Sequence, residues 1–367
     1  MTDSTVVDAV VIGAGAAGLY AAAILEQNDC DVVVLEARDR IGGRLLSAPS
    51  WTGPLDLGAT WFWANEQRIC SLIADAGLAS FPQHLAGDMI FQTIGDGAQR
   101  MQGNQLDSPS GRLVGGMASV PELLAGQLHA DTVKLSATVT SILPGRGLDV
   151  ATPSHTWSAE HVILAVPPAL AMATIDFGDH LSDRVAELAR ATPVWMGSTV
   201  KAVAVFDRPF WRDHGLAGAA FSYSGPMREI HDMSGPDGSP AALFGFCSVP
   251  HGDPAPTEQE VTAQLVELFG DDAASPSDVV IMDWRTEPFT SPPNVEHLTN
   301  YQTYGHPEFQ KAAMDSRLHW ASTETSPVAP GHIEGALAAA ERAATAVLSS
   351  LAPATSCPET TSPGEPS

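Results

Sequence analysis

A glycine-rich segment near the start of the chain could bind a dinucleotide. Gly13, Gly15 and Gly18 have the G-x-G-x-x-G spacing and follow the apolar residues 10–12. Between a strand and a helix, such glycines let backbone amides approach a pyrophosphate, which then faces the positive end of the helix dipole. Glu36 ends the run DVVVLE, where a carboxylate would hydrogen-bond ribose hydroxyls. The pattern predicts a dinucleotide site; the alternative is a glycine-rich turn in another doubly wound protein.

A lysine inside an apolar segment could supply a positive charge. Lys201 is one of three lysines and lies in TVKAVAVF, residues 199–206. In a strand it shares a face with Val203 and Val205, so it lies either on a solvated edge or in a polar pocket. The pattern alone favours the solvated edge, because lysine is rarely fully buried.

Hydrophobic periodicity indicates the elements that would position these residues. Strands at 7–13 and 31–36 flank a helix at 16–27, which together form a parallel βαβ unit. We expect further helices at 66–76, 119–128, 257–269 and 331–348, and further strands at 133–143, 161–167, 199–206, 219–223, 241–247 and 279–284.

Other segments carry turn or capping signals. Prolines and glycines at 49–58 indicate a loop, and residues 82–111 are polar and glycine-rich without a strong period. Thr257 and Glu260 are spaced as a capping box. Residues 350–367 have the composition of a disordered tail.

Composition limits the partners. The 367 residues are 44% hydrophobic, which is enough for a large core and predicts two domains. Acidic residues outnumber basic ones by 43 to 18, and the net charge of −25 would repel nucleic acid and anionic membranes. It would attract a cationic substrate, although solubility or a salty cytoplasm is the simpler explanation.

The cysteines predict neither a disulfide framework nor a metal site. Cys30, Cys70, Cys247 and Cys357 are scattered, with no C-x-x-C pair and no histidine at metal-ligand spacing. The first strand begins too close to Met1 for a secretion signal, and no apolar run reaches the ~18 residues of a membrane span. We therefore expect a cytoplasmic enzyme with reduced thiols and no membrane partner.

The segment after the second strand distinguishes the nucleotide. In LEARDRIGGR, residues 35–44, Gly42 and Gly43 leave the backbone unobstructed and Arg44 offers a fork of donors to phosphate. This stretch resembles the flavin-containing monoamine oxidase family, whose FAD site combines G-x-G-x-x-G, an acidic residue and R-x-G-G-R. The chain is similar to a short bacterial-type member, because further segments match family blocks in the family's order: 55–78, 112–128, 163–170, 195–211, 283–291 and 318–344.

The resemblance implies which residues contact FAD. The pyrophosphate would be held by Gly13, Gly15, Ala16, Gly18, Gly42, Gly43 and Arg44. Glu36 and Arg38 would contact the ribose of adenosine, and the backbone around Val139 would contact adenine. The flavin would be surrounded by Thr60, Trp61, Trp284, Thr323 and Glu324. His332 and Ile333 begin the last helix, whose N-terminus would stabilise the negative charge of a reduced flavin.

The resemblance also assigns a role to Lys201 and an activity to the chain. The family's matching lysine hydrogen-bonds through a water to flavin N5 and assists the reaction with oxygen, where a positive charge stabilises developing negative charge. The implied enzyme is an FAD-dependent amine oxidase or dehydrogenase. A hydride passes from the carbon next to a neutral amine to flavin N5, the imine hydrolyses, and oxygen yields peroxide. A desaturase acting on C–C bonds and a flavin-binding accessory subunit remain alternatives.

The chain departs from the family at the substrate side. Where members place two aromatic side chains, it has Asn294 and His332, so we expect these two and Trp61 to contact a small-molecule substrate, an amine. His332 could also be a general base or a helix cap. Pro293 lies near the position of the family's flavin-linking cysteine, so FAD should be bound non-covalently. Ser322 replaces a glycine in the STET segment.

The expected fold class is α/β with two domains. Residues 1–78, 112–194 and 284–349 would form a Rossmann-like FAD-binding domain with a doubly wound parallel sheet. Residues 79–111 and 195–283 would form a substrate domain with a mixed or antiparallel sheet. Members usually carry a long helical insertion at 79–111, and here only a short, loop-like segment is expected. The site would then be open, or covered by a partner subunit or a second copy of the chain.

Overall fold

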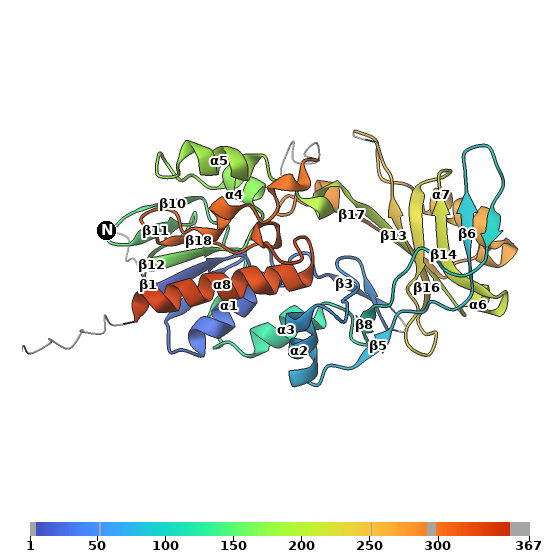
Figure 1. The fold of residues 1–367 in the computed structure, drawn as a ribbon, viewed down its shortest axis with the longest axis horizontal. Coiled ribbons are helices and arrows are strands. Elements are labelled where there is room, and N and C mark those ends of the chain that lie inside the picture. Colours follow the sequence, from blue (N-terminus) through green and yellow to red (C-terminus); the bar gives the residue numbers. More distant parts are fainter. Residues whose placement is uncertain (1–4, 51–52, 251, 292–298, 353–367) are drawn as a thin grey trace, which may run out of the picture.

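Two sheets organise the chain. The structure is a computed structural model that describes residues 5–50, 53–250, 252–291 and 299–352. Two seven-stranded sheets lie at opposite ends of the long axis of the molecule (Figure 1). Between them lie two-stranded sheets formed by β3 (Ser47–Ser50) with β4 (Gly53–Asp56), and by β5 (Ser80–Pro82) with β8 (Gly111–Leu113) (Figure 1).

The first sheet is mainly parallel. Its central strand β1 pairs in parallel with both β2 and β12, and β10 and β11 add an antiparallel edge. The strand order is β10-β11-β12-β1-β2-β9, with β18 also parallel to β12. Its strands are β1 (Thr5–Ile12), β2 (Val32–Leu35), β9 (Val133–Lys134), β10 (Ser141–Pro144), β11 (Leu148–Ala151), β12 (Thr156–Leu164) and β18 (Leu318–Trp320).

Helices cover both faces of this sheet. Ala9 and Val11 of β1 face the core under α1 and α8, whereas Val10 and Ile12 face the core under α4 and α5 (Figure 1). Burial on both faces explains the uninterrupted apolar run. The helices are α1 (Ala16–Glu26), α2 (Gln67–Asp75), α3 (Ser119–Gly126), α4 (Pro168–Thr174), α5 (Asp183–Arg190) and α8 (Ile333–Leu351).

The second sheet is mixed, with order β17-β13-β16-β15-β14-β6-β7. All neighbours are antiparallel except β14 and β6. Its strands are β6 (Asp88–Gln92), β7 (Gln99–Met101), β13 (Val200–Phe206), β14 (Leu216–Ser222), β15 (Met227–Asp232), β16 (Ala241–Cys247) and β17 (Asp278–Asp283). One face packs against α6 (Phe210–Asp213) and α7 (Glu258–Phe269). The other face packs against Leu55, which belongs to β4, and against Leu57, which follows that strand.

Single-turn 3-10 helices complete the chain. They are η1 (Trp195–Ser198), η2 (Asp271–Ala274), η3 (Trp284–Thr286), η4 (Tyr301–Thr303), η5 (Pro307–Gln310) and η6 (Thr323–Thr325).

The structure confirms the α/β fold class, the βαβ opening and the capping box at Thr257 and Glu260. It corrects three expectations. Residues 133–143 do not form one strand, because β9 pairs with β2 whereas β10 pairs with β11. Residues 49–58 are not a loop throughout, because they contain all of β4 and the last two residues of β3. The loop-like interpretation of residues 82–111 is wrong, because β6 and β7 extend the edge of the second sheet.

The end of the chain also differs from the expectation. Helix α8 continues to Leu351, so the expected tail does not begin at residue 350. Residues 353–367 lie outside the described part of the chain. The division of the chain into two domains stays a prediction.

Candidate cofactor and substrate site

The glycine-rich turn depends on the absence of side chains. Gly13 has a φ of +100°, and a Cβ there would lie 2.9 Å from Cγ1 of Val166. A Cβ on Gly18 would lie 1.8 Å from the carbonyl oxygen of Gly13, so only glycine lets α1 pack against the turn. At Gly15 a Cβ would approach just the Gly42 carbonyl, at 3.9 Å, among the described residues. The backbone at Gly15 therefore borders open space.

Glu36 joins this turn to the segment after β2. The carboxylate is 4% exposed and accepts hydrogen bonds from the backbone N–H groups of Ala14, at 2.7 Å, and Arg38, at 2.9 Å. The Arg38 guanidinium donates to Glu287, at 2.8 Å, and to Thr290, at 2.9 Å. These bonds fix the carboxylate and the guanidinium at one end of the glycine-rich turn.

A cleft opens along the turn. It brings together predicted residues from four separate segments of the chain. Those that line it are Gly13, Gly15, Ala16, Glu36, Arg38, Gly42, Gly43, Arg44, Thr323, His332 and Ile333. Val139 lines an adjoining recess, which shares Gly13, Glu36 and Arg38 with the cleft.

Other predicted residues lie behind the cleft wall. Trp284 is fully buried, and its indole N–H donates to the carbonyl of Leu57 at 2.8 Å. Thr60 is 3% exposed and donates to the carbonyl of Gly58 at 3.4 Å. Neither side chain lines the cleft as the structure describes it.

Arg44 and Glu324 form a buried ion pair beside the cleft. The two guanidinium nitrogens of Arg44 lie 2.5 and 3.2 Å from the two carboxylate oxygens of Glu324. Glu324 is fully buried, whereas the Arg44 side chain is 22% exposed. The pair presents a fixed guanidinium to the cleft.

The start of α8 closes one end of the cleft. His332 occupies the N-cap position, but its side chain does not cap the helix, so the capping alternative is wrong. Its Nδ1 lies 2.6 Å from Oε1 of Glu66, and this hydrogen bond raises the pKa of His332, partly offset by burial. Thr323 donates to the carbonyl of His332 at 2.7 Å and accepts from the Gly331 N–H at 2.9 Å.

Lys201 lies inside the second sheet. Its strand, β13, runs between β16 and β17, and the side chain is 2% exposed, so the solvated-edge alternative is wrong. Nζ donates to the carbonyl of Gly58 and lies 4.9 Å from the ring centroids of both Phe244 and Phe246. Burial lowers the pKa of Lys201 to about 7, against the opposing effect of Asp56.

An aromatic cluster surrounds this lysine. The Trp61 ring lies 5.6 Å from Phe244 and 6.4 Å from Phe246, and its indole N–H donates to Gln83 at 2.9 Å. His231 packs 5.1 Å from Trp61. Sequence analysis did not identify Phe244, Phe246 or His231. Strand alternation across 241–247 could have indicated the two phenylalanines, whereas β15, which carries His231, was not predicted.

Other cleft residues were also missed. The described lining includes Trp195, Met196, Phe289 and Thr290. They belong to segments 195–211 and 283–291, whose family resemblance was the available signal. Asn294 and Pro293 lie outside the described residues.

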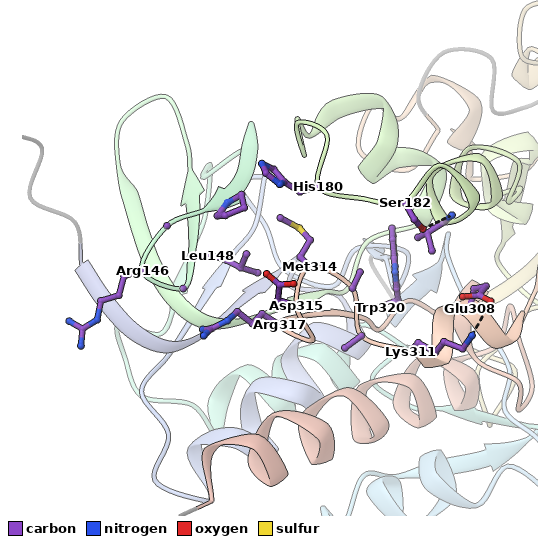
Figure 2. Close-up of a pocket in the computed structure, with 16 residues that line it drawn as sticks. Arg146, Leu148, His180, Ser182, Glu308, Lys311, Met314, Asp315, Arg317 and Trp320 are labelled. Carbon is purple, nitrogen blue, oxygen red and sulfur yellow. Dashed lines mark hydrogen bonds and ion pairs between the residues drawn. The ribbon is translucent and has the colours of Figure 1, made fainter.

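A second cavity lies away from this cleft. Figure 2 shows His180, Ser182, Lys311, Arg317 and Trp320 around it. None of the predicted site residues lines it. Two of its cations are already paired, Lys311 with Glu308 at 3.0 Å and Arg317 with Glu160 at 2.6 Å.

The described residues hold neither a metal-binding cluster nor a helix able to span a membrane. They contain no cluster of three or more His, Cys, Asp or Glu side chains arranged to hold a metal ion. None of the described helices has both the length and the apolar composition needed to cross a membrane.

The cleft fits a dinucleotide. Gly15 presents bare backbone to open space, Arg44 supplies a guanidinium, and the N-terminus of α8 supplies backbone N–H groups. These groups together match an anionic pyrophosphate and an electron-accepting ring.

Comparisons with known proteins agree with this chemistry. Residues 95–348 match the family model of flavin containing amine oxidoreductases, and residues 11–75 match that of an NAD(P)-binding Rossmann-like domain. The protein named "Putative flavin-containing monoamine oxidase AofH" of Mycobacterium tuberculosis is 27% identical, over 94% of this chain and 97% of its own. An L-amino acid dehydrogenase of Synechocystis is 23% identical, over 96% and 97%.

A solved structure has the same fold. Putrescine oxidase bound to putrescine superposes with a TM-score of 0.81 at 20% identity, covering 95% of this chain and 100% of that one. The alignment with the mycobacterial relative spans 448 positions, more than the 367 residues here, so that relative has segments that this chain lacks. The chain is thus an FAD-dependent oxidoreductase and belongs to the flavin containing amine oxidoreductase family.

Proposed function

We propose that this chain oxidises a small-molecule amine to an imine, which water then hydrolyses. The observation that carries the proposal is the position of Lys201. It is buried among aromatic rings, and Nζ bonds the carbonyl of Gly58, a residue close in sequence to Ala59 of the cleft wall. When bound, FAD supplies a two-electron acceptor for the hydride of the amine α-carbon, and dioxygen then takes up these electrons as hydrogen peroxide.

The chain's own residues would hold the cofactor at three points. Backbone amides at Gly15 and Gly43, together with Arg44, would bind the pyrophosphate. Glu36 would accept hydrogen bonds from ribose hydroxyls, and the recess at Val139 would take adenine. The N-terminus of α8 at His332 and Ile333 would place backbone N–H groups beside the flavin end.

Lys201 would act on the oxygen half of the reaction. With FAD bound, this buried ammonium would stabilise negative charge developing on dioxygen, and the dry aromatic surroundings would strengthen that effect. Because the pKa of Lys201 is lowered to about 7, the side chain can also exchange its proton near neutral pH.

Trp61 and His332 would contact the substrate. Trp61 belongs to the aromatic cluster of Phe244 and Phe246, which would pack against the apolar part of an amine. His332 lies at the cleft with its side chain 46% exposed and its Nδ1 bonded to Glu66. His332 would thus stand at one of the two positions where the family resemblance places an aromatic ring; the other, Asn294, lies outside the described residues.

FAD would be bound without a covalent link. None of the described cysteines, Cys30, Cys70 and Cys247, lines the cleft. Acid precipitation of the yellow protein should therefore release all of the flavin into the supernatant. Flavin retained in the pellet would contradict this assignment.

A peroxide-release screen across amines and amino acids tests the function. An amine substrate should bleach the flavin absorption under anaerobic conditions and release peroxide in air. Bleaching by an amine without peroxide in air identifies a dehydrogenase. Bleaching by saturated carbon chains alone would favour a desaturase, and a flavin that no small molecule reduces would favour an accessory subunit.

A further inference from the structure

His231 has one ring nitrogen that forms no hydrogen bond with any described residue. The residue lies on β15 and is 5% exposed. Its Nδ1 lies 2.7 Å from Oδ1 of Asp107. Its Nε2 is buried and has no hydrogen-bond partner among the described residues. Buried polar atoms are almost always hydrogen-bonded, so this nitrogen requires a partner beyond the described residues, such as a bound ligand.

The Asp107 contact determines what that partner must be. A carboxylate only accepts hydrogen bonds, so Nδ1 of His231 carries the proton and donates it. In the neutral ring Nε2 then has a lone pair and accepts. Oε2 of Glu229 lies 3.9 Å from the same nitrogen. Two acceptors next to each other select a hydrogen-bond donor and favour a cationic one.

His231 and Lys201 lie on the same face of the second sheet. In the strand register, Lys201 of β13 lies opposite Phe246 of β16, and Phe246 in turn lies opposite Glu229 of β15. The adjacent row runs from Val203 through Phe244 to His231. Two strand spacings and one two-residue step separate the Cα atoms of Lys201 and His231 by about 12 Å.

The aromatic cluster fills the space between the two residues. The His231 ring lies 5.6 Å from Phe244 and 6.1 Å from Phe246, the same two rings that Lys201 approaches. A phenyl ring would satisfy a packing role at position 231 among these neighbours. The imidazole instead brings a carboxylate-held Nδ1 and an unpaired Nε2, which packing alone does not require.

We propose that His231, positioned by Asp107, accepts a hydrogen bond from a second donor group at the far end of the substrate. The inference rests on the proposed amine oxidation and narrows its substrate class. The preferred amines carry a terminal hydroxyl or a second amine, and plain alkylamines are poor substrates. Lys201 serves the reaction with oxygen, and His231 determines the specificity for the far end of the substrate.

Matched substrate series test the proposal. Anaerobic flavin reduction is measured with n-alkylamines of four to six carbons, with the corresponding amino alcohols, and with the corresponding diamines. The wild-type enzyme should prefer a donor-terminated amine over the alkylamine of the same length by at least about tenfold in reduction rate over Kd, about 1.4 kcal/mol. A comparison of the amino alcohols with the diamines shows whether the site prefers a neutral donor or a cationic one.

Two variants test whether His231 and Asp107 cause the preference for donor-terminated amines. His231→Phe keeps the aromatic packing and should bring the ratio close to one, while the alkylamine is still oxidised. In Asp107→Asn the amide N–H donates to Nδ1, which moves the ring proton to Nε2 and turns the acceptor into a donor. This variant should also lose the preference, which a purely structural role would not predict. His180→Phe, an exposed histidine at the other cavity, should keep it (Figure 2).

Each remaining outcome has a distinct meaning. Equal use of both series by the wild type, or an unchanged ratio in His231→Phe, overturns the role of His231. If His231→Phe does not bind FAD, an unchanged ratio in Asp107→Asn overturns it. If no amine of any series reduces the wild-type flavin, and other amines also fail in the peroxide screen, the proposed function itself falls.

Discussion

Nδ1 of His332 lies 2.6 Å from Oε1 of Glu66, although 266 positions separate the two residues in sequence. The other carboxylate oxygen of Glu66 accepts the backbone N–H of Trp63 at 3.0 Å. Glu66 therefore fixes His332, at the start of α8, to the segment that leads into α2. The imidazole at the cleft is held by a carboxylate rather than by its own helix.

Removing that carboxylate should lower the pKa of His332. In Glu66→Gln the charged partner is lost, so the proton on the imidazole is less stabilised. The histidine titration followed by NMR should shift to lower pH than in the wild type. A conservative change at an exposed carboxylate, Glu187→Gln, should leave the titration of His332 at its wild-type pH. An identical titration in both variants would show that Glu66 does not set the pKa of His332.

The same pair should make stability depend on pH. The folded-state pKa of His332 is raised above its ordinary 6.5, so its contribution is complete below pH 6.5 and is lost as pH rises through the raised pKa. The wild type and Glu66→Gln should therefore differ in Tm most at acidic pH and converge above neutrality. The opposite trend would contradict the sign of the shift.

Breaking the pair of Arg44 and Glu324 should destabilise the chain. Glu324 is fully buried, and Glu324→Gln would leave the guanidinium without its counter-charge, at a cost of about 3 kcal/mol in the free energy of unfolding. Urea unfolding of the cofactor-free protein measures this. The matched control is Glu341→Gln, whose carboxylate is 47% exposed and should contribute less than about 1 kcal/mol. Equal losses in both variants would rule out a special role for burial.

Local patterns predicted the cofactor side of the molecule well. A continuous apolar run and the steric demands of the glycines fix β1, the glycine turn and α1 within about thirty residues, so local sequence alone indicates them. The capping box at Thr257 and Glu260 is equally local. The substrate side depends on contacts between distant residues. The polar strand Met227–Asp232 forms because β14 and β16 flank it, and the hydrogen bond from His231 to Asp107 spans 124 positions.

Lys201 illustrates where sequence reasoning stops. Its alternation with Val203 and Val205 is compatible with an edge strand or a central one. The pairing of β13 with both β16 and β17 decides the question, and no residue of β13 encodes that pairing locally. The same limit applies to residues 82–111. Their strand β6 pairs with β14 at the edge of the second sheet, and β7 pairs with β6.

A methyl group on Gly18 should abolish cofactor binding. Its Cβ would meet the carbonyl oxygen of Gly13 at 1.8 Å, so α1 must move away from the turn. Gly18→Ala should lower the free energy of unfolding by about 1–3 kcal/mol. The purified variant should show little absorbance from bound flavin. In Gly126→Ala, at the end of α3, the new Cβ meets no described atom within 4 Å. That control should remain yellow, and a yellow Gly18→Ala with wild-type Tm would refute the steric argument.

Replacing the buried lysine should separate the two halves of the reaction. In Lys201→Met the side chain keeps its length but loses the charge that would stabilise negative charge on oxygen, so reoxidation should slow by at least about tenfold. Anaerobic reduction of the flavin should change much less. Lys311→Met, which removes a side chain that is 67% exposed, should alter neither rate. Reoxidation at the wild-type rate would remove Lys201 from the mechanism.

The pH dependence of reoxidation tests the same charge without changing the packing. Because burial lowers the pKa of Lys201 to about 7, the side chain is cationic below that pH and neutral above it. The reoxidation rate of the wild type, measured by stopped-flow absorbance in oxygenated buffer, should therefore fall as pH rises through about 7. In Lys201→Met this step should disappear and the rate should stay low throughout. A step of equal size in the variant would assign the titration to another group, with His332 and its raised pKa as the next to test by Glu66→Gln.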